Sequence, residues 1–84
     1  MTTNNNYKSA VLGAGSFGTV IANMLAVNGF ATTLWMCSDK QLQAINSIGE
    51  NAAYLPGYQF DPTLRFTTEL EQALEGADTV FFAV

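Results

Sequence analysis

The stretch VLGAGSFGT, residues 11–19, places three glycines between an apolar run and a helical pattern. The run over residues 10–12 is typical of a parallel strand covered on both faces. After the glycines, apolar residues recur at helical spacing: Phe17, Val20, Ile21, Met24 and Leu25. A glycine-rich loop alone is weak evidence of function, but this strand-and-helix context is the one in which such loops bind dinucleotide phosphates. The stretch therefore predicts a strand, a phosphate-binding loop and a helix with an apolar stripe.

Each glycine of this loop has an expected task. Gly13 makes the tight turn off the strand, Gly15 leaves room for a pyrophosphate, and Gly18 lets the helix pack closely on the first strand. The backbone amides of Gly15, Ser16 and Phe17 are expected to point at the phosphates from the positive end of the helix. The alternative is a structural turn that binds nothing.

The rest of the chain alternates strands and helices. The strands are expected over 7–13, 31–36, 64–67 and 78–84, and the helices from 16 to 28, 38 to 49 and 68 to 76. Ser38 with Gln41 and Thr68 with Glu71 fit capping boxes that start the second and third helices. Gly29, Gly49 and Gly76 are expected to end the three helices, and Asn51, Pro56-Gly57 and Asp61-Pro62 indicate turns in between.

This β-α-β-α-β-α-β order predicts an α/β fold with right-handed crossovers, a parallel sheet and helices on both faces. The chain stops inside its most hydrophobic strand, at Val84. We therefore expect residues 7–84 to be the N-terminal part of a domain that continues in a longer parent chain. Residues 1–6 are expected to form a flexible tail.

Composition excludes several classes of partner. The 84 residues have a net charge of −4 and only three cations, so no basic patch for nucleic acid can be assembled. Four of the acids, Glu69, Glu71, Glu75 and Asp78, are expected on the solvated side of one helix. One cysteine and no histidine permit neither an internal disulfide nor a zinc site, and no metal ligand is predicted. Because no signal peptide or membrane span is recognisable, a cytoplasmic setting without membrane partners is expected.

The cofactor choice depends on the end of the second strand, where an acid usually binds the adenosine ribose. The sequence there is Trp35-Met36-Cys37-Ser38-Asp39, with no acid at the strand tip itself. Asp39 is either that acid or a helix N-terminal residue that favours the helix dipole. Ser38 and Lys40 could accept a 2′-phosphate, so both NAD and NADP stay open. Cys37 is either a reactive thiol or a small half-buried residue.

Six stretches together resemble one family. They are GAGSFGT at 13–19, NGF at 28–30, LW at 34–35, NAAYLPG at 51–57, TTELEQAL at 67–74 and AV at 83–84. The chain resembles the N-terminal portion of NAD(P)-dependent glycerol-3-phosphate dehydrogenase of the soluble bacterial type. The Asn-x-x-Tyr-Leu-Pro stretch is the most specific of the six.

The resemblance implies a Rossmann domain that binds NAD or NADP, followed in the family by a helical substrate domain. It implies interconversion of sn-glycerol 3-phosphate and dihydroxyacetone phosphate for glycerophospholipid synthesis. Ser16 and Phe17 would then contact the cofactor pyrophosphate, and Cys37 and Ser38 would lie near the adenosine ribose. The family often has arginine or histidine at the position of Cys37, so a strong preference for NADP is in doubt.

The family's catalytic lysines and its substrate-phosphate residues lie beyond Val84, so no catalytic residue is predicted here. The small phosphorylated substrate would be bound mainly by those missing residues, and a homodimer of the parent chain stays open. The 84 residues alone are expected to be inactive and to bind dinucleotides weakly or not at all. The alternatives are another Rossmann dehydrogenase and a non-catalytic dinucleotide-sensing module.

Overall fold

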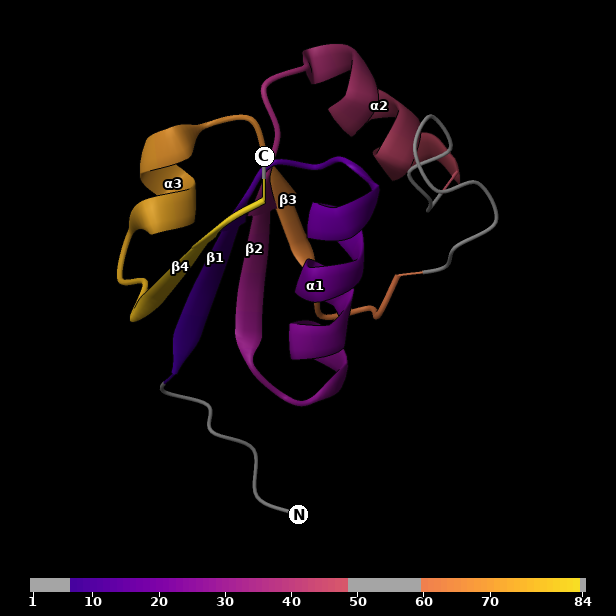
Figure 1. Cartoon of the computed structure of the whole chain (residues 1–84). Coiled ribbons are helices and arrows are strands. Elements are labelled where there is room, and N and C mark those ends of the chain that lie inside the picture. The colour runs from indigo at the N-terminus through magenta and orange to yellow at the C-terminus, as the bar shows by residue number, and fades with distance from the viewer. Residues whose placement is uncertain (1–6, 49–59, 84) are drawn as a thin grey trace.

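The elements follow the expected order in the computed structural model, which describes residues 7–48 and 60–83. They are β1 (Lys8–Leu12), α1 (Ser16–Val27), β2 (Ala31–Trp35), α2 (Asp39–Ile48), β3 (Arg65–Thr67), α3 (Leu70–Leu74) and β4 (Thr79–Phe82) (Figure 1). The predictions for residues 1–6, for the helix end at Gly49 and for the turns and family stretch within 51–57 lie outside the described residues.

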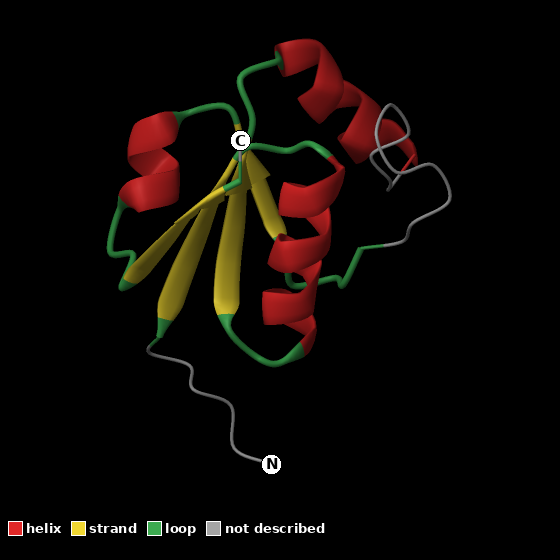
Figure 2. Ribbon diagram, in the orientation of Figure 1, coloured by secondary structure: helices red, strands yellow, loops and turns green. Residues whose placement is uncertain are grey.

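The four strands form one parallel sheet in the order β3-β2-β1-β4 (Figure 2). Val11 in β1 is paired with Leu34 of β2 on one side and with Phe81 of β4 on the other. The chain thus builds outward from β1 to β3 and then crosses to the other side of β1. This reversal is the switch point at which open α/β sheets bind their ligands, outside the carboxyl ends of the strands.

Helices α1 and α3 cover opposite faces of the sheet. In β2, Leu34 belongs to the core that also contains Ala22 of α1. Its neighbour Thr33 lines a pocket together with Gln72 of α3. Because successive side chains of a strand point to opposite faces, the two helices lie on opposite sides, which confirms the predicted architecture.

The face of α1 that packs on the sheet differs from the predicted stripe. Its buried residues are small or polar: Gly18, Thr19, Ala22, Asn23 and Ala26. Ile21 and Leu25 pack against the core as expected, but Phe17 is 71% exposed and Met24 56% exposed. The prediction of a single apolar stripe was therefore wrong for Phe17 and Met24, which do not join the core. The reason is steric. The residues of α1 that face the sheet are small, and small side chains let the helix backbone pack close to the strands.

The helix ends follow the glycine predictions and only part of the capping predictions. Gly29 and Gly76 have positive φ angles of 92° and 69° and end α1 and α3 as expected. Ser38 Oγ accepts a hydrogen bond from the Gln41 amide at 3.2 Å, which confirms the serine half of the first capping box. The second box was wrong.

Helix α3 starts one residue later than the second box predicted, and the hydroxyl bonded to its start belongs to the residue before Thr68. The helix begins at Leu70, and its N-cap Glu69 makes no side-chain cap bond. Thr67, and not Thr68, accepts the amide of Glu69, at 2.9 Å. Thr67 is the buried last residue of β3, so the sheet holds its hydroxyl in place to receive that amide.

The segment before β3 is tied to α1 and turns at Asp61-Pro62, as predicted. Asn23, buried on α1, accepts the Asp61 amide at 2.6 Å. The Asp61 carboxylate accepts the hydroxyl and the amide of Thr63, and these bonds hold the pKa of Asp61 below its usual value.

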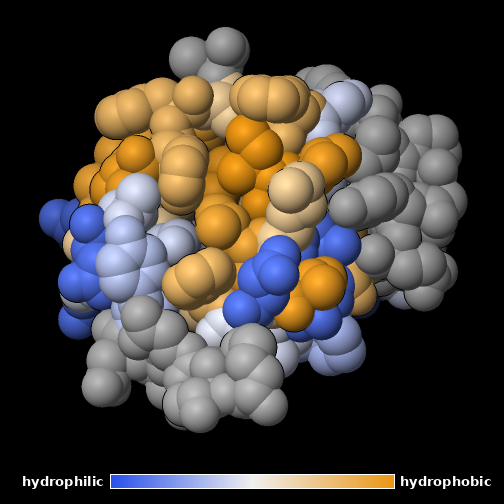
Figure 3. Space-filling model, turned by 60° about the horizontal axis from the view of Figure 1, so that its bottom comes forward, coloured by the Kyte–Doolittle hydropathy of each residue, from blue (hydrophilic) through white to orange (hydrophobic). Residues whose placement is uncertain are grey.

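Strand β4 is the most exposed part of the sheet. Among the described strands it pairs with β1 alone. Val80, Phe81 and Phe82 are all exposed, Phe82 by 76%. Figure 3 shows hydrophobic side chains gathered in a broad area on one face of the molecule.

Candidate dinucleotide-binding site

The glycine loop lies at the carboxyl end of β1, between the ends of its two neighbouring strands. The Gly13 amide donates to the Trp35 carbonyl of β2 at 3.0 Å. The Ala83 amide, just after β4, donates to the Leu12 carbonyl of β1 at 2.9 Å. The loop is therefore placed at the switch point of the sheet.

The three glycines of the loop have different structural requirements. Gly13 has a φ of 116°, which few other residues adopt. A Cβ on Gly18 would lie 1.9 Å from the Gly13 carbonyl oxygen and 3.0 Å from the Cβ of Ala83. Gly15 has a φ of −74° and no atom within 4 Å of the position of its Cβ. The fold thus requires glycine at 13 and 18, whereas it would accept a side chain at 15.

The start of α1 faces the same open space with a positive potential. Gly15 is the N-cap and supplies no side chain to the cap, and the first turn carries no acid. The first amides of any α-helix have no acceptor within the helix, and the helix dipole adds positive charge there. Ser16 and Phe17 are exposed at this end. This arrangement suits an anion.

Two side chains that the sequence did not single out as site residues hold the loop. The Thr19 hydroxyl is buried and donates to the Gly15 carbonyl at 2.7 Å. The Gln41 side-chain amide reaches from α2 and donates to the Ala14 carbonyl at 3.0 Å. A threonine four residues after a glycine within a helical pattern is the signal that could have indicated the first bond. Nothing in the sequence indicates the second bond.

The expected ribose-binding residues follow β2. Cys37 is exposed, so the interpretation of this residue as a small half-buried one was wrong. Ser38 is half-buried and caps α2, and Asp39 is the exposed first residue of that helix. Because Gln41 links α2 to Ala14, the Cys37–Ser38 segment lies on the glycine-loop side of the sheet.

Fold and loop together define a Rossmann-type α/β domain. A family model described as the N-terminus of NAD-dependent glycerol-3-phosphate dehydrogenase matches residues 8–84. The chain belongs to this family.

Individual relatives agree with this assignment. The chain is 45% identical over 74 residues to glycerol-3-phosphate dehydrogenase [NAD(P)+] of Psychrobacter cryohalolentis, covering 88% of this chain and 17% of that protein. It is 47% identical over 75 residues to the enzyme of the same name from Pseudomonas paraeruginosa, covering 89% and 22%. The crystal structure of glycerol-3-phosphate dehydrogenase from Coxiella burnetii superposes with a TM-score of 0.86 at 36% identity, covering 93% of this chain and 24% of that one.

The chain thus spans about a fifth of the length of the curated relatives it matches. Within the described ranges 7–48 and 60–83, no helix has the length and apolar character needed to cross a membrane.

Proposed function

We propose that these residues are the cofactor-binding part of an oxidoreductase that interconverts sn-glycerol 3-phosphate and dihydroxyacetone phosphate with NAD or NADP. The reaction would serve glycerophospholipid synthesis. The bound nicotinamide would supply or accept the hydride. The contribution of this chain is to hold the dinucleotide, because the substrate-binding residues of the family lie outside it.

The observation that carries the proposal is Gly15. Its backbone conformation is open to any residue, and no atom lies within 4 Å of its Cβ position. A glycine that the fold itself does not need, at the N-terminus of a helix and at a switch point, is explained by a ligand that must approach the backbone. Gly13 and Gly18 then shape the loop, while the amides of Gly15, Ser16 and Phe17 face the pyrophosphate.

The adenosine end of the dinucleotide is proposed to lie against Cys37 and Ser38. The tip of β2 offers no carboxylate, and Asp39 is exposed in the first turn of α2. A 2′-phosphate would therefore meet little repulsion, yet Cys37 offers it no charge. Both NAD and NADP fit this end, with no strong preference.

The decisive experiment uses the parent protein and the change Gly15→Val. We expect loss of NADH and NADPH binding in a calorimetric titration, because the side chain occupies the space of the pyrophosphate. The midpoint of urea unfolding should stay nearly unchanged, since the position is open. Retained affinity would mean that the loop is structural. Absence of dihydroxyacetone phosphate reduction by the unaltered protein with either cofactor would refute the enzyme and leave the dinucleotide-sensing module or another dehydrogenase.

Cys37→Arg tests the adenosine end. A guanidinium beside a 2′-phosphate forms charge-assisted hydrogen bonds, so the affinity for NADPH relative to NADH should rise about tenfold. Cys37→Ser is the control and should leave the ratio unchanged. An unchanged ratio in the arginine variant would place the ribose elsewhere.

A further inference from the structure

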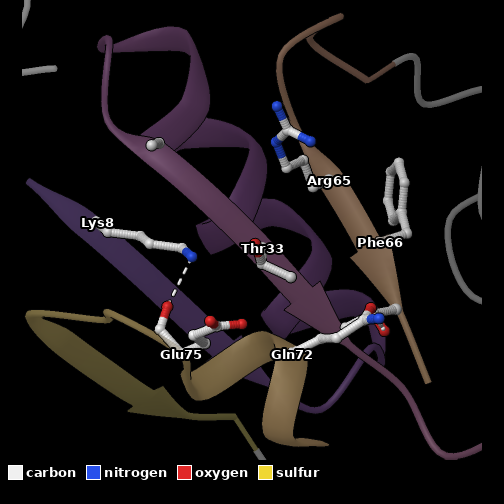
Figure 4. A pocket seen from close by; sticks show the side chains of 8 residues that line it. Lys8, Thr33, Arg65, Phe66, Gln72 and Glu75 are labelled. Atoms are coloured by element: carbon white, nitrogen blue, oxygen red, sulfur yellow. Dashed lines mark hydrogen bonds between the residues drawn. The ribbon is translucent and has the colours of Figure 1, made fainter. Parts of the chain in front are cut away.

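A concave site lies on the α3 face of the sheet and begins at the amino ends of β1 and β2. This amino-end pocket has a volume of ≈500 Å³ and is lined by Lys8, Ala31, Thr33, Arg65, Phe66, Thr67, Gln72 and Glu75 (Figure 4). Lys8, Ala31 and Arg65 are the first residues of β1, β2 and β3. Arg65 is paired with Thr33 in the middle of β2, and Thr67 with Trp35 at its carboxyl end, so the pocket extends along the α3 face to the carboxyl end of β3. The glycine loop follows the carboxyl end of β1 and does not belong to this lining.

The pocket gathers most of the positive charge of an acidic chain. The protein has three lysine and arginine residues and a net charge of −4. Two of the three, Lys8 and Arg65, line this pocket, while Glu75 is the only acid among the lining residues that the structure describes. The third cation, Lys40, is exposed on α2. Asp78 accepts the Lys8 amide at 2.8 Å, and Asp61 lines a neighbouring pocket with Arg65, so acids also lie near both cations. An anion is therefore favoured only where it contacts the cations directly.

Two of the lining side chains, Arg65 and Thr33, use none of their hydrogen-bond donors within the described residues. The Arg65 guanidinium is exposed at the start of β3 and makes no ion pair or hydrogen bond with any residue of 7–48 or 60–83. Thr33 is 7% exposed, and its hydroxyl likewise has no partner within these ranges. In Figure 4, Thr33 lies between Lys8 and Arg65. The three residues thus form a row of donors across three strands.

The Gln72 side chain is oriented by Thr67. The Thr67 hydroxyl accepts the Glu69 amide at 2.9 Å and donates its proton to Gln72 Oε1 at 3.0 Å. Because the oxygen of the Gln72 amide is engaged there, its two N–H groups are the part that remains for a ligand.

Lys8 is held by the C-terminal end of α3. Its ammonium group donates to the Glu75 carbonyl at 2.6 Å, at the C-terminal end of α3 (Figure 4). One of three N–H donors is used in this bond, so two remain. The Glu75 carboxylate, also a lining group, can accept hydroxyl protons from a ligand.

We propose that the amino-end pocket binds a small phosphate monoester that also carries hydroxyl groups. The phosphate lies against Arg65 and the Thr33 hydroxyl, because a guanidinium matches the geometry of phosphate oxygens. The hydroxyl groups of the ligand reach Gln72 and Glu75, and the positive charge of the Lys8 ammonium attracts the phosphate. The proposal does not depend on the glycine loop.

The test is an NMR titration of the ¹⁵N-labelled chain at constant ionic strength, with inorganic phosphate and with glycerol 2-phosphate as probes. We expect glycerol 2-phosphate to shift the amide signals of Thr33 and Arg65–Thr67 and the side-chain amide of Gln72, with half-saturation at ~1 mM. Inorganic phosphate should move the signals of Thr33 and Arg65 with lower affinity, since it lacks the hydroxyl groups.

Three variants separate a built site from general attraction by charge. Arg65→Ala should weaken binding of glycerol 2-phosphate at least tenfold, whereas Lys40→Ala, with the same change in charge, should leave it unaltered. Thr33→Val keeps the charge and the shape and should weaken binding severalfold.

Three outcomes would overturn the proposal. The first is an equal loss of affinity in the Arg65 and Lys40 variants, and the second is a set of shifts confined to residues 13–18. The third is equal affinity for the two probes, which would leave no role for Gln72 and Glu75.

Discussion

The side chains of α1 differ in size between the face that lies on the sheet and the face that is exposed. The face toward the sheet contains Gly18, Ala22 and Ala26, and all three are buried. The face toward the exterior contains Phe17, Met24 and Val27, which are 71%, 56% and 63% exposed. Ile21 and Leu25 pack against the edge of the core, but the residues buried directly against the sheet are the small ones. On this helix, hydrophobicity alone does not select the buried face, and the close approach to the sheet also decides it.

The close packing of α1 on the sheet positions the N-terminal end of the helix. Gly18 lies directly against the Gly13 carbonyl and Ala83, so the helix start is close to the ends of β1 and β4. The amides of the first turn are thereby placed at the switch point. A helix that stood further from the sheet would move those amides away from the proposed pyrophosphate.

The largest expected effect is that of Gly18→Ala. The new Cβ would lie 1.9 Å from the Gly13 oxygen, so either the loop or the helix must move. We expect a loss of at least ~3 kcal/mol in the free energy of unfolding, measured with urea, despite the better helix propensity of alanine. Gly15→Ala is the matched control and should cost less than ~1 kcal/mol. Equal losses would show that close approach does not set the packing.

A smaller effect is expected from Ala22→Leu. Ala22 is fully buried against the sheet, so three extra carbon atoms force α1 outward. We expect a loss of ~1–3 kcal/mol in the free energy of unfolding. Met24→Leu, which exchanges one large hydrophobic side chain for another on the outer face, should be nearly neutral. If both variants were neutral, the inner face would be loosely packed and the comparison would fail.

The bond between α2 and the loop is tested by Gln41→Leu. Removal of the donor to the Ala14 carbonyl should cost ~1 kcal/mol. It should also accelerate hydrogen exchange of the Gly13 and Thr19 amides about fivefold, because these amides are hydrogen-bonded in the closed loop and the loop opens more often. Gln43→Leu, on an exposed position of the same helix, is the control. Unchanged exchange would mean that Thr19 alone holds the loop.

The smallest effect is expected for Met24→Gln. The side chain is 56% exposed, so its replacement by a polar group of similar length should change the free energy of unfolding by less than ~0.5 kcal/mol. A loss above ~1.5 kcal/mol in thermal or urea unfolding would show that the outer face of α1 is covered in solution.

Much of the fold was accessible from the sequence because its signals are local. The alternation of strands and helices, the glycine loop and the glycine ends at Gly29 and Gly76 each depend on a few neighbouring residues. The start of α3 could not be predicted, because two consecutive threonines, Thr67 and Thr68, precede Glu69. Only the position of β3 in the sheet decides which of the two hydroxyls accepts the Glu69 amide. Gln41 was predicted as a cap partner, whereas its contact with Ala14 joins elements 27 residues apart.

The sequence by itself determined the element order, the position of the loop and the resemblance to glycerol-3-phosphate dehydrogenases, because periodicity and glycine placement act over short stretches. Only the tertiary structure decided which face of α1 is buried, because that choice depends on the space between helix and sheet. It also separated Gly15 from Gly13 and Gly18. The three look alike in VLGAGSFGT, but steric contacts across the fold require two of them and leave the third open for a ligand.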